Sequence, residues 1–313
     1  MRLLQCRSPR GSRHRAALVS ALGGAAVLLG AACAHDWGFY DPASGGAPSS
    51  SASSGAGGAG AGGASSSSGT GGAPVTCPKL GDAKLVPVPT DIGGFCIDDS
   101  EVTNRAYKAW LDTGPSTVNQ PPYCSSNASF LPAGNWPPSS ALLDHPVRFV
   151  DWCDARAYCE SVGEYLCGSI QRAQPLAPTD FSNPGRSQWY RACSSNGGRT
   201  FPYGDTYEAT ACDGIDYGAT DDAGAATTIV VKSAKGCVGG YLGLYDMSGN
   251  VWEWEDACDA ALGKGDACRI RGGGFTNTSD SLSCTASSTV ARDTTAVNVG
   301  FRCCADACPK GGC

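Results

Sequence analysis

Histidine is scarce in this chain, with three residues among 313, and His145 is the only one after residue 75. A nucleophilic triad would have to use His145, and the Gly-x-Ser-x-Gly elbow of many serine hydrolases is absent. No two cysteines have the C-x-x-C spacing of zinc fingers. These absences argue against a hydrolase and a structural zinc site, so we expect His145 to be a core or turn residue.

Basic clusters are also missing after residue 33. Residues 1–33 hold five of the 23 Lys and Arg residues and none of the 29 acidic ones, so the remaining chain has a formal net charge of −11. A nucleic-acid-binding surface needs Lys and Arg to neutralise phosphates. The composition therefore excludes nucleic acid as an expected partner.

Residues 1–33 have the features of an export signal. A basic start precedes an apolar run at 16–30, which is too short to span a bilayer as a stable helix, and small residues follow. Two processing routes are open: simple cleavage at the A-x-A site of 32–34, or lipidation of Cys33 as in bacterial lipoproteins. We favour lipidation because a tether follows. The expected location is the cell envelope, in the outer membrane or periplasm, or outside the cell.

Residues 34–75 form the predicted flexible linker. Gly, Ala and Ser make up almost all of 41–73, and such a segment buries too little surface to fold. A coil of about 40 residues has a root-mean-square reach of roughly 35 Å, which suits a tether between a lipid anchor and a folded domain. An inert tail is the alternative. Residues 76–313 are predicted to be one domain.

The pattern of residues 84–304 predicts an α+β fold with much irregular backbone. Thr103 and Asp151 are the expected N-caps of two helices. The expected strands are 84–89, 94–98, 146–150, 269–275 and 299–304, and the expected helices are 104–112, 152–162 and a short turn at 187–193.

The stretch 239–254, GGYLGLYDMSGNVWEW, is predicted to be a buried loop rich in turns. Its apolar residues are too many for a solvated loop. Asn250 and Glu253 offer oxygen ligands three residues apart, with the Val251 carbonyl between them, which suits Ca²⁺. The alternative is a plain turn in which Asn250 bonds its own backbone.

A series of motifs resembles the formylglycine-generating enzyme, or sulfatase-modifying factor, family. In chain order they are LVPVPTDIGGFCIDDSEVTNRAYKAWL, HPVRFVDWCDARAYCESVG, SQWYRAC, FPYGD, GLYDMSGNVWEW, RGGGF and GFRC. The resemblance implies a C-type-lectin-related α+β domain that is rich in loops and disulfides. It also implies Ca²⁺ at Asn250, Val251 and Glu253. Another calcium loop of the family aligns with Asp213, Asp216, Asp221 and Asp222, although a solvated acidic loop is the simpler interpretation.

Sixteen cysteines follow residue 33, an even number that predicts up to eight disulfides in an exported protein. The resemblance implies the pairs Cys159–Cys303 and Cys193–Cys284. Proximity in sequence suggests Cys258–Cys268, Cys77–Cys96, Cys212–Cys237 and Cys124–Cys153. Cys167, Cys304, Cys308 and Cys313 stay unassigned, and adjacent strand residues Cys303 and Cys304 are expected to have different partners.

The copper ligands of the family are missing. Family members bind Cu(I) through two cysteines in the loop after Arg-Gly-Gly-Ser and oxidise a substrate cysteine to formylglycine. The corresponding stretch, RGGGFTNTSDSLSC, has only Cys284, which aligns with a structural cysteine. Ser and Thr cannot replace thiolates for Cu(I). Copper is therefore not expected, and catalysis is doubtful.

Two functions remain as hypotheses. The first is a binding or scaffold module whose former catalytic groove recognises a peptide or glycan through Phe275, Thr276, Asn277 and Asp280; a plain surface loop is the alternative. The second is an oxygen-dependent oxidase of protein cysteine with other ligands. The carboxyl groups of Asp98, Asp99 and Glu101 match the family's strand-to-helix turn, so we interpret them as capping groups rather than catalytic acids.

Overall fold

The computed structural model describes residues 75–313 except 82–83, 135, 173–174 and 310–311. The predicted export signal with Cys33, and the linker up to residue 74, lie outside the described residues. Within the described part of the chain, no helix combines the length and apolar content that a bilayer crossing requires.

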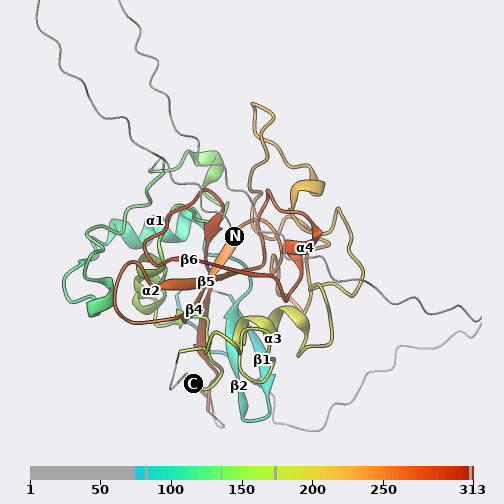
Figure 1. Ribbon diagram of the computed structural model, residues 1–313, viewed down its shortest axis with the longest axis horizontal. Coiled ribbons are helices and arrows are strands. Elements are labelled where there is room, and N and C mark those ends of the chain that lie inside the picture. Colours follow the sequence, from blue (N-terminus) through green and yellow to red (C-terminus); the bar gives the residue numbers. More distant parts are fainter. Residues whose placement is uncertain (1–74, 82–83, 135, 173–174, 310–311) are drawn as a thin grey trace, which may run out of the picture. The chain divides into compact units, whose positions relative to one another are not determined.

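Short helices and two four-stranded sheets are connected by long irregular segments (Figure 1), as expected for a loop-rich α+β domain. The helices are α1 (Asn104–Asp112), α2 (Trp152–Ser161), α3 (Gln188–Ser194) and α4 (Ser279–Leu282), with 3-10 turns at Pro122–Cys124, Ser140–Leu142 and Ile215–Tyr217. The strands are β1 (Leu85–Thr90), β2 (Gly93–Asp98), β3 (Tyr165–Leu166), β4 (Trp252–Cys258), β5 (Ala267–Arg271), β6 (Ser287–Ala291), β7 (Val299–Gly300) and β8 (Cys303–Asp306).

The two sheets have the strand orders β1-β2-β8-β3 and β6-β5-β4-β7. All neighbouring strands are antiparallel except β4 and β7, which run parallel. The first sheet thus pairs an early hairpin with the last strand of the domain. Because its strands come from distant parts of the chain, this sheet brings together residues that no local pattern connects.

Helices α1 and α2 begin where the sequence predicts. The Thr103 hydroxyl accepts a hydrogen bond from the Ala106 N–H at 3.1 Å, and Asp151 forms a capping box with Asp154. Apolar side chains at helical spacing then face each other across the pair, and the rings of Tyr107 and Tyr158 stack at 5.5 Å. Capping and aromatic packing therefore explain this half of the core.

The strand predicted at 269–275 extends too far, because β5 ends at Arg271 and Gly272 has φ 86°. Two other strand predictions are wrong. Residues 146–150 contribute only an isolated bridge from Pro146 to Thr103, because the backbone at Phe149 adopts φ 61° and cannot continue as a strand. The stretch 299–304 is divided between β7 and β8, which belong to different sheets. Between them lie Phe301 and Arg302, both fully buried. The chain thus crosses from one sheet to the other at an arginine, which becomes central to the site.

The stretch 239–254 is only partly a loop. Asp246, Gly249 and Asn250 have positive φ, as a chain of tight turns requires, but β4 begins at Trp252. Gly249 is needed because a Cβ there would lie 2.5 Å from the Asp213 carbonyl oxygen. The turns thus press this loop against the segment around Asp213.

The sulfur network accounts for every cysteine in residues 75–313. The six disulfides expected above all form, and the unassigned cysteines pair as Cys167–Cys304 and Cys308–Cys313. Cys303 and Cys304 do have different partners, since side chains alternate along β8. These residues therefore contain no free thiol.

Candidate functional site

A buried ion pair occupies the position predicted to hold calcium. Glu253, on the central strand β4, is 1% exposed and accepts hydrogen bonds from Arg302 Nε and Nη2, each at 2.7 Å. The indole Nε1 of Trp189 donates a third at 2.8 Å. The carboxylate is therefore satisfied by protein donors, and the structure gives no support to Glu253 as a calcium ligand.

The Arg302 guanidinium also bonds three main-chain carbonyl oxygens. It donates to the main-chain oxygens of Tyr245 and Asp246, both at 3.0 Å, and to that of Asp98 at 3.2 Å. Burial by itself would lower the pKa of Arg302, but the Glu253 carboxylate raises it above its usual value. A permanently charged guanidinium thus supplies positive charge at the centre of the domain.

Asn250 and Val251 have structural roles as well. The Asn250 Oδ1 accepts a hydrogen bond from the Ile229 N–H at 3.1 Å, and its main-chain oxygen accepts from the Phe275 N–H at 2.9 Å. Val251 is buried with 1% exposure. Asn250 therefore joins three distant segments instead of bonding its own backbone. The Asn250 Oδ1 and the Glu253 carboxylate are thus already bound by protein donors, which argues against a metal ion held by Asn250, Val251 and Glu253.

Asp213 is different, because its carboxylate is an orphaned buried group. It is 2% exposed, and neither oxygen accepts a hydrogen bond from a described residue. Burial, with the nearby charge of Asp246 as a second cause, raises its pKa to about 7. Carboxylate and carbonyl oxygens are the donors that Ca²⁺ uses. Asp213 is therefore the member of the predicted calcium loop that fits a hard cation.

The other acids of that loop do not join Asp213. Asp216 and Asp222 are exposed, and Asp216 accepts a hydrogen bond from the Tyr207 hydroxyl at 2.9 Å. Asp221 accepts from the N–H groups of Ala223 and Ala225, both at 2.9 Å, as an Asx turn does. These three acids therefore belong to a solvated acidic loop, which was the simpler interpretation.

The predicted ligand groove is also corrected. Phe275 and Asn277 are each 4% exposed, so neither side chain faces a ligand. The Asn277 Oδ1 accepts hydrogen bonds from Trp252 Nε1 at 2.8 Å and from the Gly274 N–H at 2.9 Å. Only Thr276 and Asp280 are exposed. The loop after β5 packs inward because Asn277 satisfies buried donors of its neighbours.

His145 is a structural residue in the described chain, as expected. Its Nδ1 lies 3.0 Å from the Thr228 hydroxyl, and the ring is half-buried. Burial, with the neighbouring Arg148 charge as a second cause, lowers its pKa. No cysteine, serine or acid is arranged with it as a triad among its hydrogen-bond partners in the described residues.

The sequence and fold were compared with those of known proteins. The Sulfatase-modifying factor enzyme 1-like domain family matches residues 63–307.

The chain belongs to this family.

Among its relatives, the formylglycine-generating enzyme of Bos taurus is 30% identical over 206 residues, which cover 56% of this chain and 48% of that protein. The aligned part therefore spans about half the length of this curated relative. Among solved structures, CarF has a TM-score of 0.45 at 21% identity and covers 74% of this chain and 96% of its own. PvdO from Pseudomonas aeruginosa has a TM-score of 0.44 at 18% identity and covers 72% and 92%.

The sulfatase-modifying-factor-like domain contains acids whose roles the sequence did not reveal. Asp98, Asp99 and Glu101 are not capping groups, because Thr103 alone caps α1. Asp98 accepts a hydrogen bond from the Cys303 N–H, and Asp99 pairs with Lys232 at 3.0 Å. Burial raises the pKa of Asp98 to about 7 and that of Glu101 well above its ordinary value.

Glu164 was missed altogether. It is 5% exposed in the turn between α2 and β3, and burial, followed by the charge of Asp98, raises its pKa to about 9. The one local signal was an acid placed directly before the apolar start of a short strand. Its neighbour Asp98 lies 66 residues earlier in the chain, so no spacing motif connects the two acids.

Proposed function

We propose that this family member is an exported, lipid-anchored binding or scaffold domain and not a copper oxidase. The observation that carries the proposal is that all sixteen cysteines of residues 75–313 are in disulfides. Cu(I) needs soft ligands such as thiolates, and disulfide sulfur is a poor substitute. The one cysteine after the Gly-rich strand, Cys284, is fully buried and bonded to Cys193.

Eight disulfides support export, because such bonds persist in oxidising compartments. A lipid on Cys33 would then attach the domain through its linker to a membrane. Replacing Cys33 by Ala should move the full chain from the membrane fraction to the soluble fraction, and Cys6→Ala should not. Retention of the Cys33→Ala protein in the membrane would argue for simple cleavage or another anchor.

A bound calcium ion is part of the proposal, with Asp213 as its carboxylate ligand. Asn250, Val251 and Glu253 are left out, since their environment does not fit a cation. The ion would neutralise a buried charge and secure the loop that packs against Gly249. It would stabilise the domain rather than take part in a reaction.

As the binding site for a peptide or glycan we propose two neighbouring hollows beside the 114–131 loop, in place of the groove first predicted. One, of about 400 Å³, is lined by Pro115, Phe130 and Leu131 among others. The second, of about 320 Å³, also contacts Phe130 and adds Asn119 and Arg156. The walls of both hollows combine polar and apolar surface in similar amounts, and both are open to solvent. Their mixed character suits a peptide or a glycan.

Binding to peptide and glycan arrays tests this surface. We expect saturable binding that Asn119→Gly or Arg156→Gln weakens about tenfold, the loss of one good polar contact. Glycine is the suitable replacement because Asn119 has φ 72°, and Thr276→Ala on the corrected groove is the matched control. Absence of all binding, or equal loss in the control, would contradict the assignment.

The oxidase alternative is supported by the names of the curated relatives. Its test is copper binding by the oxidised domain, followed by mass spectrometry of a Cys-x-Pro-x-Arg peptide incubated with oxygen and a reductant. Stoichiometric Cu(I) together with an aldehyde product would overturn the binding proposal.

A further inference from the structure

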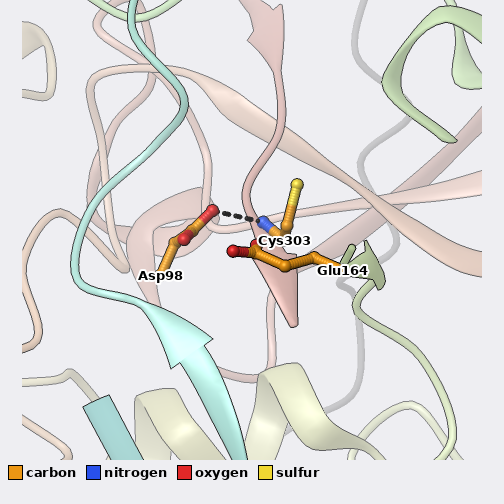
Figure 2. Close-up of side chains that lie close together, drawn as sticks. All are labelled: Asp98, Glu164 and Cys303. Atoms are coloured by element: carbon orange, nitrogen blue, oxygen red, sulfur yellow. Dashed lines mark hydrogen bonds between the residues drawn. The ribbon is translucent and has the colours of Figure 1, made fainter. Parts of the chain in front are cut away.

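Three segments of the domain bring two carboxylates and a sulfur together. Asp98 ends β2, Glu164 lies in the turn between α2 and β3, and Cys303 begins β8. One ligand atom from each lies within 4.8 Å of the others (Figure 2), and the three residues are 8%, 5% and 0% exposed. This cluster shares no residue with the candidate calcium position at Asp213.

The carboxylates are unequally satisfied. The Asp98 Oδ2 accepts a hydrogen bond from the Cys303 N–H at 2.9 Å, drawn as a dashed line in Figure 2. Glu164 points toward the same place, yet neither of its oxygens accepts a hydrogen bond from a described residue. Burial disfavours the charged form of a carboxylate that has no partner, so Glu164 must be neutralised either by a proton or by a cation.

The backbone around Glu164 is held in place by three contacts. Its N–H donates to the Cys159 carbonyl at 2.9 Å, and Cys159 is bonded to Cys303. Tyr165, the next residue, is already paired with Cys304 in the sheet. The disulfide and the strand pairing thus hold the Glu164 backbone in place, and its carboxylate lies within 4.8 Å of that of Asp98.

No Lys or Arg forms an ion pair with either carboxylate in the described residues. Arg302 is the nearest candidate, but it donates to the Asp98 main-chain oxygen and uses its remaining groups on Glu253, Tyr245 and Asp246. The two carboxylates therefore face each other without a cation from the protein.

We propose that Asp98 and Glu164 bind a hard divalent cation. The carboxylate oxygens are the donors that Ca²⁺, Mg²⁺ and Mn²⁺ prefer. The Cys303 sulfur is bonded to Cys159 and offers no thiolate, so the donor set does not suit Cu(I), and it lacks the imidazole and thiolate ligands usual for zinc. The ion links the end of β2 to the turn before β3, and so reinforces the first sheet.

Mn²⁺ is the probe for the test, because the electron paramagnetic resonance signal of free Mn²⁺ reports binding directly. The full exported chain is stripped with EDTA and titrated. The wild type should bind one equivalent more than Glu164→Gln, whereas Asp213→Asn, the control at the other position, should retain that equivalent. Equal binding by the wild type and Glu164→Gln overturns the proposal.

Thermal unfolding in an Asp213→Asn background gives a second readout. Mn²⁺ at 1 mM should raise the midpoint of that chain by several degrees, the usual size when a ligand is present at many times its Kd. Adding Glu164→Lys, whose ammonium can pair with Asp98, should abolish the response while keeping the fold. The proposal is overturned if Mn²⁺ leaves the midpoint unchanged. A loss of stability at alkaline pH that Glu164→Gln removes would then show that the two carboxyls share a proton and that no cation binds.

Discussion

Replacing Glu253 by Gln tests the buried ion pair at the centre of the domain. The two Arg302 contacts at 2.7 Å and the Trp189 contact at 2.8 Å lie among residues with at most 1% exposure. Glutamine has one acceptor oxygen and no charge, so Arg302 would remain buried without its counter-ion. Removing one member of such a pair costs about 3–5 kcal/mol. For a domain of this size, that lowers the unfolding midpoint by roughly 6–20 °C.

Calorimetry or circular dichroism of the oxidised protein measures the change, in EDTA and again in excess calcium. We expect the same loss in both, because an arginine and not a cation neutralises Glu253. The double variant Glu253→Gln with Arg302→Met should lose less than the sum of the single variants, since removing both charges leaves neither one unpaired.

Two outcomes would refute this reasoning. A loss below about 1 kcal/mol, the range of exposed pairs, would show that the contact is not a tight buried pair. A loss seen in calcium that vanishes in EDTA would show that Glu253 binds the metal after all.

Three further predictions follow from the same structure. The pKa of Asp213 is raised in the folded state, so its contribution to stability is complete below about pH 4 and is lost as pH rises through about 7. In EDTA, denaturant titrations should show that the free energy of unfolding falls more steeply with rising pH for the wild type than for Asp213→Asn. Calcium should remove this difference. Phe275→Ala should cost about 3–5 kcal/mol in thermal unfolding, while the exposed neighbour change Thr276→Ala should stay within about 0.5 kcal/mol; wild-type stability of Phe275→Ala would restore the groove interpretation. Removing the Cys159–Cys303 bridge with two alanines should cost about 2–5 kcal/mol in guanidinium unfolding, and an unchanged midpoint would show that it does not restrain the unfolded chain.

Local signals were sufficient for α1, α2 and α3, whereas α4 was not predicted. The Thr103 side chain caps α1 by accepting a hydrogen bond from the N–H three residues later, and Asp151 caps α2 in the same way. Strand β4 was missed, and the burial of its glutamates, Glu253 and Glu255, was not expected from their charge. Glu255 pairs there with Arg271 of β5 at 3.4 Å and accepts a hydrogen bond from Ser187. The alternation of Trp and Glu over residues 252–255 is the period-2 signal of a strand, but it follows closely on the turn residues of 239–250 and was included in that predicted loop.

The structure does not support the calcium ligands predicted at Asn250 and Glu253 or the predicted groove, and the two cases have a related reason. Asn250, Glu253, Phe275 and Asn277 have the side-chain types of a site, but each is used by a neighbour that lies far along the chain. Residue type establishes what a side chain can bind, whereas burial and hydrogen-bond partners establish whether it is free to do so.

The amino-acid sequence by itself determined the family, the disulfide-rich character and the lack of a thiolate pair for copper, because these depend on which residues are present and in what order. Only the tertiary structure decided which acids are neutralised. Arg302 reaches Glu253 across 49 residues and Glu164 meets Asp98 across 66, so their electrostatic partners depend on the path of the backbone between them.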